Sequence, residues 1–131
     1  MSTELTMLAW TIVLGLVQLL IPSHFFTAAN GIAYNMGPRD TPKKPSSLLG
    51  QRFERAFRNL METFPFAAAA ILIATLANRH NGLTIWGSQL YFWSRLVYVP
   101  LYAAGIPALR SLVWLASLLG IILILVGLVA G

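Results

Sequence analysis

Four long runs of apolar residues divide the chain, and shorter polar segments separate them. A helix of about 20 apolar residues is long enough to cross the ~30 Å hydrocarbon core of a bilayer. We expect each run to form one membrane-spanning helix. The runs lie at about residues 5–26, 48–78, 83–105 and 109–129. Because no strand-like alternation accompanies them, the pattern predicts a single all-α transmembrane domain over residues 1–131.

The longest polar segment lies between the first two runs. It consists mainly of turn-forming and cationic residues, which is typical of a loop outside the membrane. Ser46 and Ser47 near its end are expected to cap the following helix. Within that helix, Pro65 is expected to cause a kink, because proline cannot donate the backbone hydrogen bond of a helix interior.

Composition narrows the class of protein. Apolar residues make up 57% of the chain and charged residues 10%, proportions that exclude a soluble globular domain. The chain has no cysteine, so any thiol chemistry must use a thiol that a substrate brings. The net charge of +5 comes mainly from cations between Arg39 and Arg58, where membrane topology explains them, and we expect no nucleic-acid partner. His24 and His80 lie far apart, and we expect no metal site.

The cations also predict which connections lie together, because Lys and Arg concentrate in the cytoplasmic loops of membrane proteins. The first connection holds Arg39, Lys43 and Lys44, and the third touches Arg110, whereas the second has only Arg79. We therefore expect the first and third connections to face the cytoplasm. This orientation brings the start of the second run to the same end of the molecule as Arg110.

Polar side chains form one stripe on each of two expected helices. At ~100° per residue, the stripe on the second helix spans about 80° and consists of Arg52, Arg55, Asn59 and Glu62. The stripe on the third helix spans about 60° and consists of Arg95, Tyr98 and Tyr102. Since these two helices should run antiparallel, we expect Arg55 to face Tyr102 and Asn59 to face Tyr98. At the deepest level we expect Glu62 to neutralise Arg95.

Ion pairing alone does not account for the arginines. A Glu62–Arg95 pair would be a structural bridge, and a non-enzymatic membrane protein, such as a scaffold or a small channel, would use it to fix helix register. The remaining arginines outnumber the acidic residues at that end. Guanidinium groups bind carboxylates through paired hydrogen bonds and stay charged, so the surplus favours a site for a small anionic ligand. Both interpretations stay open on the residues alone.

The spacing R-x-x-R-x-x-x-N-x-x-E-x-x-P, from Arg52 to Pro65, resembles the signature of the MAPEG family, the membrane-associated proteins in eicosanoid and glutathione metabolism. The segment from Arg95 to Tyr102, with Gly105-Ile-Pro107 and Arg110, is also similar to that family, and residues 35–40 resemble the first loop of its bacterial members. The resemblance implies a left-handed four-helix bundle, a homotrimer, and a glutathione site at each subunit boundary that opens toward the cytoplasmic side.

The resemblance also implies roles for individual residues. Arg110 matches the arginine that stabilises the glutathione thiolate, and it is the expected catalytic residue. The expected glutathione-binding residues are Arg52, Arg55, Asn59, Glu62, Arg95, Tyr98 and Tyr102. By this resemblance the protein is a transferase or peroxidase of a bacterial inner membrane. Glutathione is its co-substrate, and its second substrate is a hydrophobic small molecule that approaches from the membrane lipids.

Overall fold

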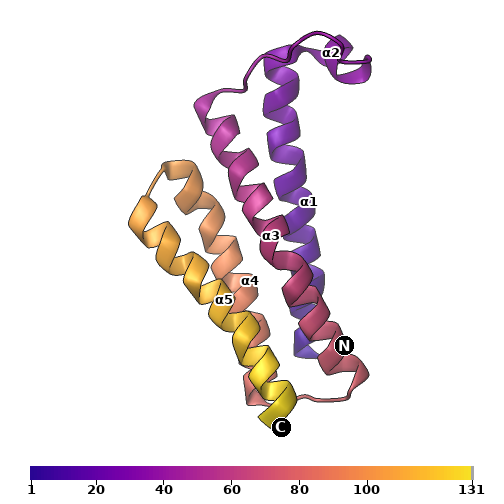
Figure 1. Cartoon of the computed structure of the whole chain (residues 1–131), viewed down its shortest axis with the longest axis vertical. Coiled ribbons are helices and arrows are strands. Elements are labelled where there is room, and N and C mark those ends of the chain that lie inside the picture. The colour runs from indigo at the N-terminus through magenta and orange to yellow at the C-terminus, as the bar shows by residue number, and fades with distance from the viewer. Residues whose placement is uncertain (131) are drawn as a thin grey trace.

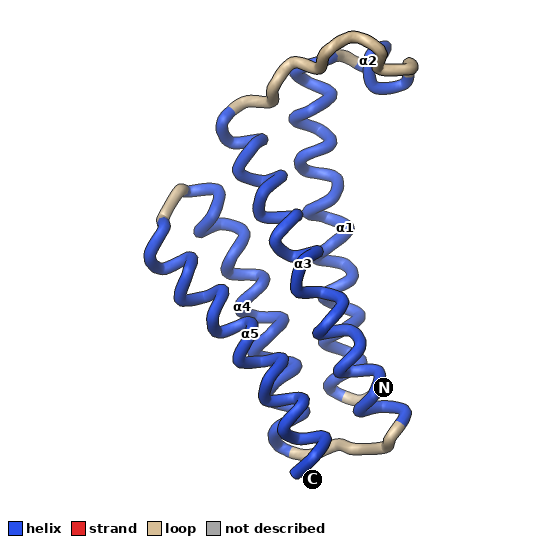
Figure 2. The backbone as a smooth tube through the Cα atoms, in the orientation of Figure 1, coloured by secondary structure: helices blue, strands red, loops and turns tan. Residues whose placement is uncertain are grey.

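The computed structural model of the protein describes residues 1–130, and within them it contains five helices and no strand (Figures 1 and 2). The helices are α1 (Thr3–Asn30), α2 (Ile32–Met36), α3 (Leu48–Leu76), α4 (Gly82–Ala104) and α5 (Pro107–Ala130). The prediction of an all-α chain is thus confirmed. The four long helices coincide with the four apolar runs, and the largest difference is at the end of α1, which closes at residue 30 rather than 26.

Three of the helices, α1, α3 and α5, are long and apolar enough to cross a membrane, which supports the expectation of a membrane protein. The fourth long helix, α4, is not among them. It carries Gln89, Ser94 and Arg95, whose polarity lowers its mean hydropathy. That α4 also crosses the membrane stays a prediction.

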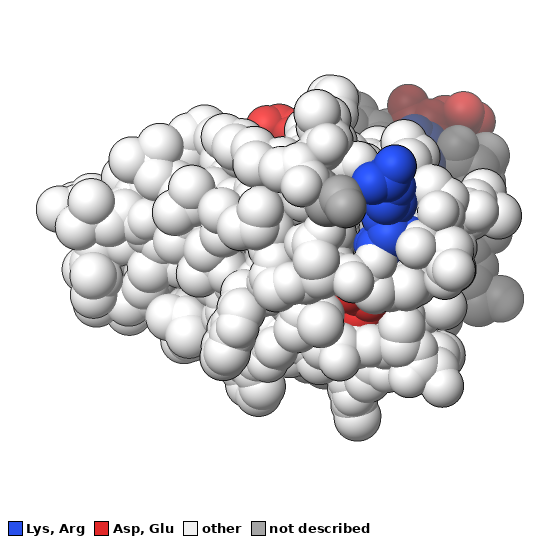
Figure 3. All heavy atoms as spheres, turned by 90° about the horizontal axis from the view of Figure 1, so that it is seen from below, with Lys and Arg blue, Asp and Glu red and all other residues white. Residues whose placement is uncertain are grey.

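The two ends of the molecule differ in charge. Figure 1 shows α2 and the α4–α5 turn toward one end, while the N-terminus and the end of α5 lie toward the other. The first and third connections therefore share an end, as the distribution of cations predicted. Of the nine Lys and Arg residues, only Arg79 lies in the connection at the opposite end. Figure 3 views the molecule from that end, and most of the surface drawn there is uncharged.

Two glycines bring α4 and α5 into close contact. A Cβ atom added to Gly87 would lie 2.6 Å from the carbonyl oxygen of Gly120, and one added to Gly120 would lie 2.7 Å from that of Gly87. No real side chain fits at such a distance. Small residues at a helix crossing allow backbones to approach closely, and this is the usual basis of tight packing between membrane helices.

Local signals define the helix ends. The Ser47 hydroxyl accepts a hydrogen bond from the Gly50 amide at 3.2 Å, which confirms the expected cap of α3. Asn81 and Thr84 form a reciprocal capping box at the start of α4, and Gly105 ends that helix with φ +74°, a conformation that favours glycine. Pro65 lies inside α3, which stays helical on both sides of it, so the kink there remains a prediction.

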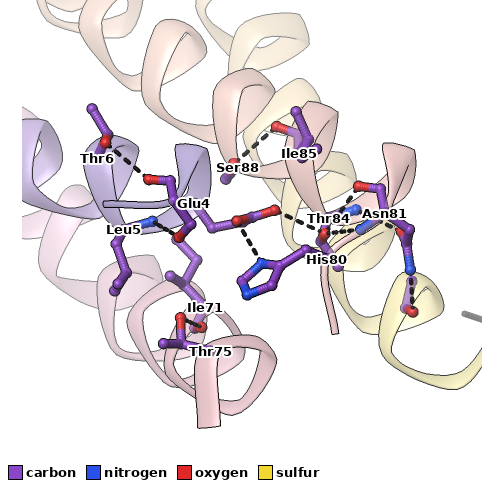
Figure 4. A network of polar contacts seen from close by, with 12 residues as sticks. Glu4, Leu5, Thr6, Ile71, Thr75, His80, Asn81, Thr84, Ile85 and Ser88 are labelled. Carbon is purple, nitrogen blue, oxygen red and sulfur yellow. Dashed lines mark hydrogen bonds and ion pairs between the residues drawn. The ribbon is translucent and has the colours of Figure 1, made fainter. Parts of the chain in front are cut away.

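A polar network closes the end that holds the chain termini (Figure 4). Glu4 is only 1% exposed, and its carboxylate lies 2.9 Å from His80 Nδ1 and accepts a hydrogen bond from the Thr84 hydroxyl at 3.0 Å. Asn81 Nδ2 donates to the carbonyl of Gly127 at 2.8 Å. The network therefore ties the start of α1, the α3–α4 connection and the last turns of α5 together.

Candidate functional site

A polar cavity of about 380 Å³ opens between α3, α4 and α5, toward the end that holds the α4–α5 turn. Its volume falls within the ~300–1,000 Å³ typical of small-molecule sites. Six of the residues that the sequence predicted for the site line this cavity. They are Arg55, Asn59, Glu62, Tyr98, Tyr102 and Arg110. The structure therefore gathers most of the predicted residues around one space, although their chemical roles remain predictions.

The ring of Tyr102 positions two arginines of the cavity. Arg55 Nε donates a hydrogen bond to the Tyr102 hydroxyl at 3.1 Å, so the predicted pairing of these residues is confirmed. The Cζ atom of Arg110 lies 4.8 Å from the centre of the same ring, and that of Arg55 lies 5.8 Å from it. Both distances allow attraction between a guanidinium and an aromatic ring. Tyr102, from α4, thus links the arginines of α3 and α5.

Arg95 lies behind the cavity wall and has no exposed surface. Its Nη1 donates to Asn59 Oδ1 at 2.8 Å, and its Cζ lies 4.1 Å from the centre of the Tyr98 ring. No ion pair within 4.0 Å joins Arg95 to Glu62 in residues 1–130, so the expected neutralisation of Arg95 by Glu62 stays a prediction. The antiparallel arrangement of the two helices predicted that Glu62 and Arg95 lie at the same depth along the bundle. It did not predict the directions of their side chains. Glu62 faces the cavity, whereas Arg95 faces the protein interior.

Arg52, also expected at the site, does not line the cavity. Its Nη1 donates to the carbonyl of Ala103 at 3.2 Å, and a Cβ atom added to Gly105 would lie 3.0 Å from its Nη2. The last carbonyls of a helix lack partners within the helix and attract cations. The structure therefore places Arg52 at the C-terminal end of α4, where it stabilises the turn that precedes Arg110.

Three lining residues were missed from sequence, namely Arg58, Ser111 and Trp114. Arg58 Nη2 pairs with Glu54 at 2.9 Å, but both side chains are largely exposed, and such pairs contribute little to stability. The guanidinium of Arg58 is therefore available to a ligand at little cost. Helical spacing could have predicted two of them. Arg58 follows Arg55 by three positions and Trp114 follows Arg110 by four, so each lies on the same helix face as a predicted site residue.

Positive charge dominates the cavity. Arg55, Arg58 and Arg110 line it against a single carboxylate, that of Glu62. Within residues 1–130 the side chain of Arg110 makes no hydrogen bond or ion pair, and its guanidinium lies beside the Tyr102 ring. A concave site with an excess of one charge concentrates ligands of the opposite charge. The arrangement suits a small ligand with more than one acidic group and one basic group.

One known protein family matches the chain. A family model described as the MAPEG family matches residues 7–130, which is nearly the whole chain. The matched segment includes every residue that lines the polar cavity, as well as Arg52 and Arg95 behind it. Among curated proteins, no match was found.

Proposed function

The chain belongs to the MAPEG family, and from that premise we propose that it is a glutathione-dependent membrane transferase or peroxidase acting on lipophilic electrophiles. The observation that carries the proposal is the polar cavity, with three guanidinium groups and one carboxylate among its lining residues. Glutathione at neutral pH has two carboxylates, one ammonium group and a thiol. Its charges therefore complement those of the cavity.

The complementarity suggests how the tripeptide binds. The Glu62 carboxylate is the one lining group that attracts the ligand ammonium. Arg55 and Arg58 lie on the same helix and bind the two carboxylates, for which the planar guanidinium offers paired donors. The amide of Asn59, which is one helical turn from Arg55 and directly follows Arg58, adds a hydrogen-bond donor. In this arrangement the thiol lies toward α5 and Arg110.

Arg110 is proposed as the catalytic residue. A thiol with a pKa near 8.5 is mostly protonated at neutral pH, and a nearby guanidinium lowers the pKa of that thiol by favouring the thiolate. The thiol proton passes to water, and the sulfur lone pair forms a bond to the electrophilic atom. The electron pair of the bond that breaks leaves with the displaced group. Because Arg110 has no other ion partner within residues 1–130, its charge is available for this step.

We further propose that all four long helices cross the membrane as a left-handed bundle and that the protein is a homotrimer in a bacterial inner membrane, with the cavity facing the cytoplasm. The cluster of cations at that end supports the orientation. The exposure of Arg55 and Glu62 at the edge of a single copy supports assembly, because charged groups beside hydrocarbon are costly and a second copy would cover them.

Titration of the detergent-purified protein with glutathione tests the proposal. Calorimetry reports binding, and ultraviolet absorbance of the thiolate reports ionisation of the bound thiol. Arg110→Ala is expected to abolish the thiolate signal and to weaken binding by less than about tenfold, since the other charged contacts remain. Arg79→Ala, at the opposite end, is the matched control and should behave as the wild type. A folded protein that gives neither binding heat nor thiolate would refute the enzyme and favour a scaffold or channel.

A further inference from the structure

Two long polar side chains are buried without enough hydrogen-bond partners. Gln18 on α1 is 2% exposed, and neither its amide nitrogen nor its amide oxygen has a partner in residues 1–130. Arg95 on α4 is completely buried, and its Nε and Nη2 atoms likewise have none there. Buried polar atoms are nearly always hydrogen-bonded, because leaving them unpaired is costly. The guanidinium of Arg95 therefore lacks hydrogen-bond acceptors, and the amide oxygen of Gln18 lacks a hydrogen-bond donor.

The contacts of α3 place both groups at about the same depth. Gly15 lies next to Leu60, since a Cβ atom added to Gly15 would be 3.8 Å from Leu60 Cδ2. Because α1 and α3 run in opposite directions, Gln18 lies about level with residue 57. The hydrogen bond from Arg95 Nη1 to Asn59 Oδ1, at 2.8 Å, brings the guanidinium to the level of residue 59. Two residues of a helix correspond to only ~3 Å along its axis.

Gln18 also points in the required direction. The buried residues of α1 recur at helical spacing and are Glu4, Leu8, Thr11 and Gln18. Two of them identify what this face meets, because Leu8 packs in a cluster with residues of α3 and α5, and Glu4 bonds Thr84 of α4. The face therefore packs against α3, α4 and α5, and Arg95 extends from α4 to Asn59 of α3 within the same bundle.

We propose that Gln18 is a positioning residue for the cavity: after a rotation of the two side chains, whose atoms the structure leaves unpaired, its Oε1 accepts a hydrogen bond from Nε or Nη2 of Arg95. A relay of Gln18, Arg95 and Asn59 then joins three helices and ends on the cavity wall. It fixes the rotamer of Asn59 and holds the Arg95 guanidinium against Tyr98, another wall residue. The pairing is inferred from the burial, the unpaired atoms and the similar level of the two side chains, whereas its effect on a ligand also rests on the proposed binding of glutathione.

Three variants test the relay. Gln18→Met keeps the size and unbranched shape of the side chain and removes its acceptor, while Gln18→Glu replaces the amide with a carboxylate. Thr11→Val is the matched control on the same face of α1, because the Thr11 hydroxyl is satisfied within its own helix by the carbonyl of Met7 at 2.7 Å. We measure the midpoint of thermal unfolding in detergent and the dissociation constant of glutathione for each variant.

The expected results differ between the two Gln18 variants. Gln18→Met should weaken glutathione binding about fivefold, the effect of losing one ~1 kcal/mol hydrogen bond. Gln18→Glu should bind as tightly as the wild type and unfold at a temperature no lower than that of Gln18→Met, since a carboxylate next to Arg95 is paired. Thr11→Val should leave the affinity unchanged.

Two outcomes would overturn the proposal. If Gln18→Glu unfolds well below Gln18→Met, its carboxylate is buried without a cation and Gln18 is not beside Arg95. If Gln18→Met binds glutathione as well as Thr11→Val does, Gln18 has no positioning role. Failure of the wild type to bind glutathione would refute the proposed function instead, and the order of the unfolding temperatures would still decide the pairing.

Discussion

Replacing Gly120 with alanine should separate α4 from α5. The added Cβ would lie 2.7 Å from the carbonyl oxygen of Gly87, 2.8 Å from the amide nitrogen of Tyr91 and 3.2 Å from its Cα. All three are backbone atoms, so no side-chain rotation relieves the contacts and the helices must move apart by several tenths of an ångström. Overpacking of this kind costs ~1–3 kcal/mol, which exceeds or equals the ~1 kcal/mol that alanine gains over glycine inside a helix.

Gly15→Ala is the matched control, because it makes the same chemical change inside α1. Its Cβ would meet only the side chain of Leu60, at an ordinary 3.8 Å. Thermal unfolding in detergent, followed by circular dichroism, should place Gly120→Ala below the wild type by up to several degrees and Gly15→Ala at or above it. Equal unfolding temperatures for the two alanine variants would refute the close approach of α4 and α5.

Three further changes test other parts of the structure. Tyr102→Phe removes the hydroxyl bonded to Arg55 but keeps the ring beside Arg110; it should weaken glutathione binding about two- to fivefold, as calorimetry would show, while Tyr102→Leu weakens it further. His80→Ala leaves the buried carboxylate of Glu4 without one of its hydrogen-bond partners; unfolding in denaturant should show a loss of up to ~3 kcal/mol, whereas a loss below ~0.5 kcal/mol would contradict the network. Glu54→Ala breaks only the exposed pair with Arg58, so the unfolding temperature should stay within about 1 °C of the wild type.

The long helices were predictable from the sequence because each depends on a long apolar run. The short helix α2 was not, since its five residues lie between Gly31 and Gly37 inside a segment rich in turn formers and show no helical period. The grouping of Arg55, Asn59 and Glu62 also followed from sequence, because residues three and four apart share a helix face.

Contacts between helices were harder to predict. The paired helices indicated which residues lie at the same level, and this gave the Arg55–Tyr102 contact correctly. It did not produce a direct ion pair between Glu62 and Arg95 in residues 1–130, because the direction of a long side chain depends on how the helices rotate about their own axes. Glu4 and His80 lie 76 positions apart, and neither belongs to a local pattern. Only the docking of α1 against the α3–α4 connection brings them together.

The arginines near the cavity form two groups, one that lines the cavity and one residue behind its wall, and mutations in the two groups should affect binding and stability differently. Arg55, Arg58 and Arg110 line the cavity, where the proposed ligand would offset their charge. Arg95 lies behind the cavity wall, where it contacts Asn59 and Tyr98. Loss of a cavity arginine should therefore weaken binding and leave folding nearly intact. Loss of Arg95 should lower stability and binding together, because it removes the support of the wall on which the ligand rests.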